Sequence, residues 1–221
     1  MQRALVIGAS GGIGSALSAS LAARGFEVTG LSRSGDGLDV TDEASVEHHL
    51  GALEGSFHRI LIATGALEIG EHGPEKALKH LSRAGMEAQF ALNTIGPALV
   101  LKHAQPLIPR DAPAVIATLS ARVGSIGDNL YGGWHSYRAS KAALNQIIRG
   151  AAIELGRTHK HAICVALHPG TVATPFTEKY LGRHPAVPPE EAAGNLLSVI
   201  DRLTPEESGA FFDWAGKPVP W

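Results

Sequence analysis

Cysteine is nearly absent from this chain, which has 221 residues and Cys164 as its single thiol. One cysteine forms no internal disulfide, and this fits a reducing compartment. The chain also has no large excess of charge of either sign, since it contains 19 Lys and Arg residues and 21 Asp and Glu residues. No basic block occurs along the chain. The composition therefore favours neither nucleic acid nor an anionic membrane as a partner.

Long apolar runs are missing as well. No stretch approaches the roughly 20 residues of a membrane-spanning helix, and no signal-peptide core precedes the first apolar run. We therefore expect a cytoplasmic protein without a membrane partner. No metal is expected either, because His48-His49 and His159-Lys160-His161 form no ligand set with carboxylates or thiols. Cys164 lies in an apolar run that is typical of a buried strand, not of a nucleophile.

Short apolar runs alternate with helical patterns along the whole chain. The runs predict strands over Ala4–Gly8, Glu27–Ser32, Arg59–Thr64, Ala114–Leu119, Ala162–Leu167 and Ala210–Asp213. Helical spacing covers Ile13–Arg24, Asp42–Leu53, a long segment ending near Pro106, Tyr137–Thr158 and Pro189–Leu203. This alternation predicts an α/β fold: a single-domain, doubly wound parallel sheet of the Rossmann type, spanning residues 1–221, with helices on both faces.

One connection is too short for this pattern. Only Ser34–Leu38 separates the second predicted strand from Asp39-Val40, whereas a parallel crossover usually needs a dozen or more residues. The sequence therefore predicts that a crossover helix is missing here, or that a strand at Leu38–Val40 is very short.

A glycine-rich turn, Gly8–Gly14, joins the first predicted strand to the first predicted helix. Gly8 permits the tight turn, Gly12 lets a diphosphate approach the backbone, and Gly14 lets the helix pack on the strand. The free N–H groups and dipole of such a helix N-terminus favour an anion. The turn therefore indicates a dinucleotide site, and a glycine turn without a ligand is the alternative.

The residues after the second strand bear on the choice of cofactor. Gly30–Ser34 contains no acid but has Arg33, a guanidinium suited to the 2′-phosphate of NADP, where an acid would favour NAD. A solvated surface arginine is the alternative. The carboxylate of Asp39 is placed to accept a hydrogen bond from the adenine amine, with the Val40 backbone along the ring. Thr41 and Asp42 are candidate caps for the next helix.

Tyr137 and Lys141 are the candidate acid/base pair. Their spacing of four puts them on one face of a helix, one turn apart, and no other tyrosine has such a partner. A phenol with a pKa of about 10 is a poor acid near neutrality, so we expect the ammonium to lower the pKa of Tyr137.

Two further polar residues accompany this pair. Ser120 follows a predicted strand, where its hydroxyl can donate to a carbonyl oxygen, and Asn93 is an amide in a mainly apolar helix, which is unfavourable by propensity. An ordinary strand-end serine and a satisfied helix amide are the alternatives.

Together these motifs make the chain resemble the short-chain dehydrogenase/reductase family over nearly its whole length. The resemblance implies that Tyr137 transfers the proton, Ser120 polarises the substrate oxygen, Lys141 holds the nicotinamide ribose and lowers the pKa of Tyr137, and Asn93 orients a water in a proton relay. It also implies a set of cofactor contacts, with Val172 and Thr174 at the carboxamide: Gly8, Ser10, Gly12, Ile13, Gly14, Arg33, Asp39, Val40, Ala63, Gly65, Asn93, Tyr137, Lys141, Pro169, Gly170, Val172 and Thr174.

Several further segments resemble one branch of this family, and one segment departs from the family pattern. The short chain, Ser120–Ser125, Gly132-Gly133-Trp134 and the C-terminal Pro-Trp resemble the branch of the sniffer carbonyl reductases and the C-factor developmental signal. Ile62–Gly65 stands where the family has Asn-Asn-Ala-Gly, so the bracing by the asparagines is lost. Ser125 is a weaker competitor for the role of Ser120.

The sequence thus predicts an NADP(H)-dependent oxidoreductase that moves hydride between nicotinamide and a small-molecule carbonyl or alcohol substrate. A non-catalytic NADP(H)-binding signalling or scaffold protein is the alternative; a nucleotide-sugar epimerase is disfavoured, because little chain remains for a sugar domain. We expect a substrate lid at about 175–189 and apolar pocket residues at Leu130, Tyr131 and Trp134. The apolar face that follows Lys141 suggests a homodimer or homotetramer, with core packing as its alternative.

Overall fold

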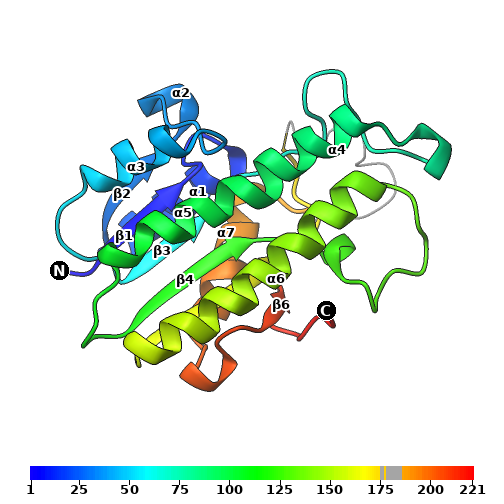
Figure 1. The fold of residues 1–221 in the computed structure, drawn as a ribbon. Helices are drawn as coiled ribbons and strands as arrows, with labels where there is room; N and C mark the ends of the chain where they lie inside the picture. The colour runs from blue at the N-terminus through cyan, green and yellow to red at the C-terminus, as the bar shows by residue number, and fades with distance from the viewer. Residues whose placement is uncertain (175–176, 178–185) are drawn as a thin grey trace.

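The computed structural model describes residues 1–174, 177 and 186–221. Its centre is one sheet in which every neighbouring pair of strands is parallel (Figure 1). The order is β2-β1-β3-β4-β5-β6. The predicted Rossmann-type sheet is confirmed, with bounds within two residues of those expected: β1 (Arg3–Ile7), β2 (Glu27–Leu31), β3 (Arg59–Ile62), β4 (Ala114–Leu119), β5 (Ala162–His168) and β6 (Phe211–Asp213).

Helices cover both faces of this sheet. One face carries α3, α5 and α6, which lie in front of the sheet in Figure 1, and the other carries α1 and α7. The bounds are α1 (Gly12–Ala23), α2 (Arg33–Asp36), α3 (Glu43–Gly51), α4 (Arg83–Phe90), α5 (Gly96–Ala104), α6 (His135–Thr158) and α7 (Pro189–Ile200). The doubly wound arrangement places every strand's carboxyl end at the same edge.

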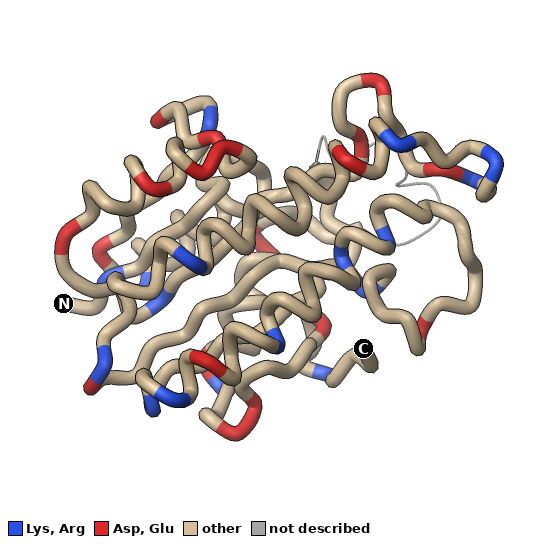
Figure 2. Tube along the Cα trace, in the orientation of Figure 1, with Lys and Arg blue, Asp and Glu red and all other residues tan. Residues whose placement is uncertain are grey.

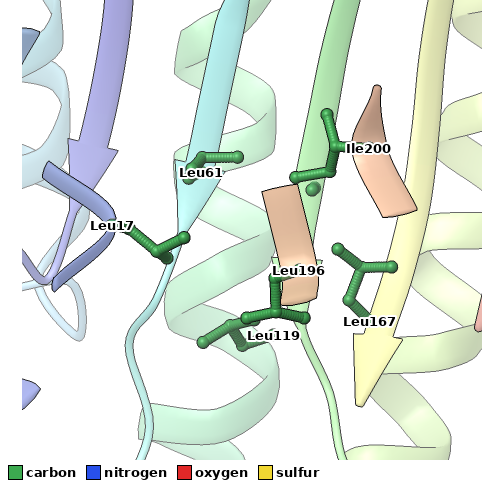
Figure 3. A pocket seen from close by; sticks show the side chains of 7 residues that line it. Leu17, Leu61, Leu119, Leu167, Leu196 and Ile200 are labelled. Carbon is green, nitrogen blue, oxygen red and sulfur yellow. The ribbon is translucent and has the colours of Figure 1, made fainter. Parts of the chain in front are cut away.

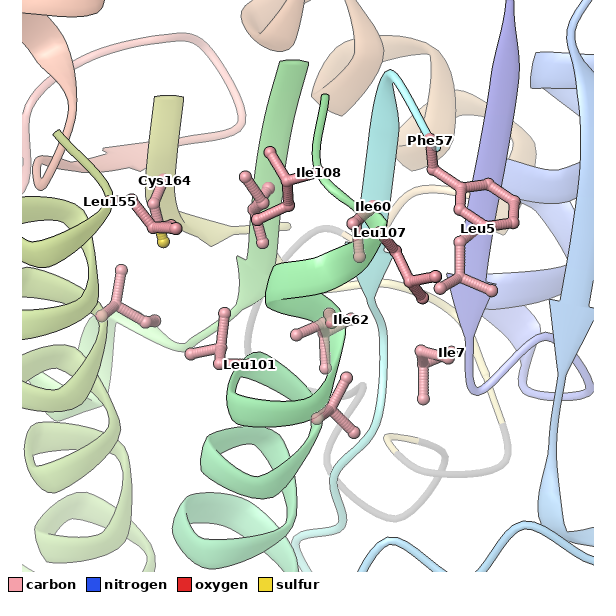
Figure 4. Close-up of a cluster of buried hydrophobic side chains, with 14 of the residues drawn as sticks. Leu5, Ile7, Phe57, Ile60, Ile62, Leu101, Leu107, Ile108, Leu155 and Cys164 are labelled. Carbon is pink, nitrogen blue, oxygen red and sulfur yellow. The ribbon is translucent and has the colours of Figure 1, made fainter. Parts of the chain in front are cut away.

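Two apolar clusters hold these layers together. Even-numbered residues of β4 and β5 face α6, where Ile116 and Cys164 meet Leu144 and Ile148 (Figure 4 shows this side of the sheet). Odd-numbered residues, such as Val165, face α1 and α7. Because strands buried on both faces need apolar side chains at every position, the continuous apolar runs were a sound signal for them. Each fully buried Leu or Ile contributes about 1.5–3 kcal/mol.

One packing gap lies in the second cluster. Figure 3 shows it between α1, α7 and the sheet, lined by aliphatic side chains alone. A cavity without a polar group holds neither water nor a polar ligand. It therefore belongs to the core and not to a site. Its lining is Leu17, Leu61, Ala117, Leu119, Leu167, Leu196 and Ile200.

The short connection after β2 agrees with the first of the two predicted alternatives, the loss of the crossover helix, and not with the second, a very short strand. The crossover helix is reduced to the single turn α2, and Leu38–Val40 forms no strand. The backbone N–H of Leu38 instead turns back to the carbonyl of Ser32. As a result β2 has a sheet neighbour on one side only.

The long helix that was predicted to end near Pro106 is interrupted. Between α4 and α5 the residues Ala91–Ile95 form one π-helical turn, labelled η2, and α5 passes into a 3-10 turn at Gln105–Leu107. A π turn adds one residue to the helix and is frequently found at functional sites. Asn93 lies in the middle of it.

Lys/Arg and Asp/Glu positions are interspersed along the chain trace, without a long segment of one sign (Figure 2). Within the described residues, none of the helices combines the length and apolarity needed to cross a membrane.

Candidate active site

The turn between β1 and α1 is built for glycine. Gly8 has a left-handed φ of 87°, and its carbonyl accepts from the N–H of Gly11 at 3.0 Å. A Cβ on Gly14 would lie 2.1 Å from the carbonyl oxygen of Gly8. Backbone cannot move aside for it, so helix α1 packs on the strand only when Gly14 is glycine.

The N-terminus of α1 is open to a ligand. Its N-cap, Gly11, has no side chain, and the first turn carries no acidic residue. Ser10 and Gly12 are exposed, and Ile13 is half-buried. A Cβ on Gly12 would lie 2.7 Å from Cγ2 of Thr174, so the segment after β5 approaches this turn from the other side. Uncapped N–H groups and an empty Cβ position fit the diphosphate of a dinucleotide.

Arg33 is the first residue of α2 and is exposed beside the end of β2. Sequence reasoning found no acid at this strand end, but the structure brings one there. Asp36 Oδ2 accepts from the backbone N–H of Ser32 at 2.9 Å. Ser34 is exposed on the same turn. A guanidinium and a carboxylate thus share the end of β2.

Asp39 makes a local turn. Its Oδ1 accepts from both the backbone N–H and the hydroxyl of Thr41, at 2.9 and 2.7 Å, and these bonds hold the pKa of its carboxyl below the usual value. The predicted bond to adenine would have to share this carboxylate. Val40 is buried, and a Cβ on Gly96 would lie 2.8 Å from its Cγ2. Asp42 caps α3 through the N–H of Ala44, as predicted.

The residues after β3 lead into the candidate catalytic group. The N–H of Ala63 donates to Ile7, which extends the β1–β3 ladder to the sheet edge. Gly65, at φ 145°, has no room for a side chain. A Cβ there would lie 2.8 Å from Asn93 Oδ1 and 3.3 Å from Lys141 Nζ. Gly65 therefore lies against two of the predicted catalytic residues and brings them to one place.

Asn93 is fully buried, and its amide is fully used. Oδ1 accepts from the N–H of Ala66 at 3.0 Å, while Nδ2 donates to the carbonyl of Ala66 at 2.8 Å and to Gln89 Oε1 at 2.6 Å. The neighbouring Thr94 hydroxyl donates to the carbonyl of Ser140 on α6. These bonds hold the π turn against both the β3 loop and the helix of Tyr137.

Ser120 stands one residue beyond β4, and its N–H donates to the carbonyl of Leu167 at 2.8 Å. Its buried hydroxyl donates to Asn145 Oδ1 at 2.6 Å. Ser125, the competitor, is engaged elsewhere, because its Oγ accepts from the N–H of Asp128. The structure thus brings Ser120 to the sheet edge and gives Ser125 a role in the following loop.

Tyr137 and Lys141 both lie on the buried face of α6. Lys141 Nζ donates to the carbonyl of Leu119 at 3.1 Å, which brings the ammonium beside Ser120. Burial lowers the pKa of Lys141 to about 8, and burial raises the pKa of Tyr137 well above its ordinary value. The expected lowering of the Tyr137 pKa is therefore wrong for the protein alone, because desolvation penalises both charged forms and outweighs their proximity.

Glu75 is a residue that sequence reasoning missed. Helix α6 has no cap of its own, since its N-cap is Trp134 in a left-handed conformation at φ 51°. The Glu75 carboxylate accepts from the N–H of Ser136 at 3.2 Å and from the Ser136 hydroxyl, and its carbonyl accepts from the N–H of Trp134. Burial opposes ionisation, yet the bonds from Ser136 lower the pKa of Glu75. The cap sets where the turn of Tyr137 begins.

The segment after β5 runs from Pro169 to Thr174. A Cβ on Gly170, at φ 79°, would lie 3.0 Å from the ring of Trp214, and Val172 is buried and bridges to Val187. Thr174 faces Gly12 across the glycine turn. The predicted lid at 175–189 lies mostly outside the described residues, along with Phe176, Tyr180 and Leu181.

The predicted apolar pocket residues are only partly brought to the site. Leu130 and Tyr131 are 82% and 91% exposed. Side chains this exposed lie at the surface and not against the catalytic residues. Trp134 does lie beside Tyr137, with ring centroids 6.4 Å apart in an edge-on arrangement.

Burial raises the pKa of Cys164 to about 12, which leaves it a core thiol. The described residues contain no group of three His, Cys, Asp or Glu side chains that could hold a metal.

A parallel sheet with this glycine turn defines a dinucleotide-binding α/β protein. A family model described as enoyl-(acyl carrier protein) reductase matches residues 8–210. The 1-hydroxy-2-glutathionyl-2-methyl-3-butene dehydrogenase of Rhodococcus sp. (strain AD45) is 34% identical, with both chains covered in full. C-signal of Myxococcus xanthus is 34% identical over 72% of this chain and 96% of its own. The chain belongs to the short-chain dehydrogenase/reductase family and is an oxidoreductase of that type.

Solved structures agree with the fold. Carbonyl reductase Sniffer of D. melanogaster superposes with a TM-score of 0.83 at 20% identity, and both chains are covered in full. An NADPH-bound carbonyl reductase from chicken fatty liver gives 0.82 at 25% identity, over 100% of this chain and 94% of its own. The predicted resemblance to the sniffer and C-factor branch is therefore confirmed.

Proposed function

We propose that this protein is an NADP(H)-dependent oxidoreductase that interconverts a small-molecule carbonyl and its alcohol. The observation that carries the proposal is the gathering of polar groups at one edge of the sheet. Gly65 lies against both Asn93 and Lys141, and Lys141 donates to the residue before Ser120. Tyr137 lies one turn before Lys141 on the same buried helix face.

The residues present fit a dinucleotide. The open N-terminus of α1 would hold the diphosphate, Arg33 the 2′-phosphate, and the segment Pro169–Thr174 the nicotinamide end. When bound, NADP(H) supplies or accepts the hydride. The solved structure of the chicken carbonyl reductase with NADPH supports this choice of cofactor.

In the reductive direction Ser120 and Tyr137 would both donate to the carbonyl oxygen as negative charge develops on it. Tyr137 then gives up its proton to that oxygen. Lys141 would return a proton to the phenol through a water near the π turn of Asn93, whose own side-chain amide is already fully bonded. Burial keeps the phenol protonated at neutral pH, since it raises the pKa of Tyr137. A protonated phenol is the form that the reductive step needs.

The test measures NADPH consumption with a panel of aldehydes, ketones and quinones. Tyr137→Phe should lower kcat at least about 100-fold and leave NADPH affinity, measured by fluorescence titration, unchanged. The matched control is Tyr131→Phe, because Tyr131 is an exposed tyrosine in the preceding loop. Normal turnover by Tyr137→Phe would overturn the proposal.

Cofactor choice is tested at α2. Arg33→Ala should weaken NADPH binding at least about tenfold and leave NADH binding within about twofold, because it removes the partner of the 2′-phosphate. Asp36→Asn should shift the preference the other way. Equal losses for both cofactors in Arg33→Ala would show that Arg33 does not contact the 2′-phosphate.

Finer features belong to the same proposal. The name of the Rhodococcus relative is that of a dehydrogenase for a primary alcohol with a glutathionyl group on the next carbon, so primary alcohols with a neighbouring thioether belong in the panel. The outer face of α6 leaves Ile147 and Ile153 exposed. This face is our candidate for the contact of a homodimer or homotetramer, which light scattering would detect. We place this single-domain enzyme in the cytoplasm.

A non-catalytic role is the second candidate, because C-signal, a relative with the name of a signal, matches 72% of this chain and 96% of its own length. NADPH binding without turnover of any carbonyl in the panel would favour it. The Tyr137, Lys141 and Ser120 group argues for catalysis, since a scaffold needs no ammonium one turn beyond a phenol.

A further inference from the structure

The face of α6 that carries Tyr137 and Lys141 presents a third polar side chain, Asn145, one turn further on. Asn145 is buried, with 3% of its surface exposed. Its Oδ1 accepts the Ser120 hydroxyl at 2.6 Å, the one hydrogen bond of this hydroxyl among the described residues. A buried amide on a helix face needs a partner, and here that partner is the proposed catalytic serine.

The other end of the amide faces the loop after β4. Nδ2 of Asn145 lies 3.5 Å from the carbonyl of Gly124, at the limit of a hydrogen bond. This loop packs hard on the helix, since a Cβ on Gly124 would lie 2.7 Å from Cβ of Lys141. The amide is therefore held strongly by Ser120 and only weakly by the loop.

This arrangement creates a conflict for catalysis. A serine hydroxyl has one proton, and here it points to Asn145. It cannot donate to a substrate oxygen at the same time. If the proton simply turned away, Oδ1 would be left buried without a donor, which costs about 1–3 kcal/mol. A half-turn of the amide frees the serine proton, because Nδ2 then donates to Ser120 Oγ; it gives up the long bond to Gly124 and turns Oδ1 toward that loop.

We propose that Asn145 is a positioning residue for Ser120: it holds the hydroxyl at the strand end and, by turning its N–H toward Ser120 Oγ, directs the serine proton at the substrate oxygen. The inference rests on the proposed function, in which Ser120 polarises that oxygen. Asn145 itself touches neither substrate nor cofactor in this scheme.

The test is a double-mutant cycle with Ser120→Ala and Asn145→Leu, a replacement of similar volume. Asn145→Leu should lower kcat about 10- to 100-fold with NADPH affinity within about twofold. In the Ser120→Ala background the same change should lower kcat by less than about twofold, because the residue acts through the serine. If the kcat losses of the two single variants multiply in the double variant, the inference is overturned.

A second variant separates positioning from packing. Asn145→Asp has nearly the same shape but offers Ser120 only acceptors, so it should keep the serine proton and lower kcat at least as much as Asn145→Leu. Wild-type kcat in Asn145→Asp would overturn the amide rotation. Gln146→Leu, at the next and exposed helix position, is the matched control and should leave kcat unchanged.

The outcomes also separate the inference from the function. If Ser120→Ala keeps full kcat, the proposed role of Ser120 fails and the inference fails with it. If Ser120→Ala is impaired while Asn145→Leu is not, only the inference fails. Urea unfolding verifies that each variant folds. If Asn145→Leu does not fold, Asn145→Ala takes its place in the cycle.

Discussion

His168 should make the protein sensitive to mild acid. It is the last residue of β5 and is aligned with Asp213 on β6, while β4, on its other side, ends at Leu119, just before Ser120. Its Nδ1 is buried without a hydrogen-bond partner. Burial lowers the pKa of this imidazole from 6.5 to about 4, helped by the charge of Arg122 and opposed by Asp213. The folded protein therefore holds His168 neutral where the unfolded chain would protonate it.

The sign and size of the effect follow from this difference. Below pH 6.5 the unfolded chain binds a proton that the folded protein refuses, so the free energy of unfolding falls as the pH falls. The gap between 6.5 and about 4, at about 1.4 kcal/mol for each pH unit, amounts to about 3 kcal/mol lost by pH 4. This stability is fully present above pH 6.5.

Urea unfolding at several pH values between 4 and 7.5 would measure the loss. His168→Gln removes the titration, so the difference in unfolding free energy between wild type and variant should change by about 3 kcal/mol over this range. His80→Gln, which changes an exposed histidine, should follow the wild-type curve. Parallel curves for wild type and His168→Gln would refute the reasoning.

Three further changes have definite expected outcomes. Gly14→Ala should abolish folding or NADPH binding, seen by circular dichroism and fluorescence titration, because its Cβ would meet Gly8 at 2.1 Å. Gly150→Ala should raise the free energy of unfolding by roughly 0.5–1 kcal/mol in urea, since open space surrounds this helical glycine. Glu75→Ala should lower it by about 1 kcal/mol through loss of the α6 cap, and Glu75→Gln by less; equal stability of all three proteins would rule the cap out.

Much of the fold could be predicted because buried parallel strands carry a plain signal. A strand covered on both faces needs an unbroken apolar run, and Ala114–Leu119 was predicted with its observed bounds. The run Arg59–Thr64 was predicted two residues too long, since β3 ends at Ile62 and, after one last ladder bond from Ala63, the chain turns to Gly65. Apolar character alone does not mark where a strand stops pairing.

The π turn at Asn93 escaped the prediction for a different reason. An apolar pattern with a period of 3.6 residues cannot register one inserted residue, so it predicted a continuous helix. The low helix propensity of Asn93 did mark the position as unusual, and the structure shows the amide bonded to the loop after β3. A local conflict with propensity was thus the sign of a tertiary role.

The site residues that were missed depend on partners far away in the sequence. Glu75 caps a helix that begins some 60 residues later, and no spacing rule links the two. Asn145 could have been found, because a polar amide four residues after Lys141 lies on a face that is otherwise buried. The direction of the Tyr137 pKa needed the structure, since spacing gives proximity to Lys141 but not the desolvation of both groups.

Unpartnered polar atoms are concentrated where the chemistry is proposed. Of the four buried side-chain atoms without a hydrogen bond in the described chain, three belong to Thr64, Thr118 and His168, at the carboxyl ends of β3, β4 and β5. Each such buried atom costs about 1–3 kcal/mol of folding free energy when it has no hydrogen-bond partner. The opposite face of the sheet has a purely aliphatic gap instead. A fold selected for stability alone would have apolar residues at these three positions, so their placement at the ligand edge argues that this edge is kept polar for a bound molecule.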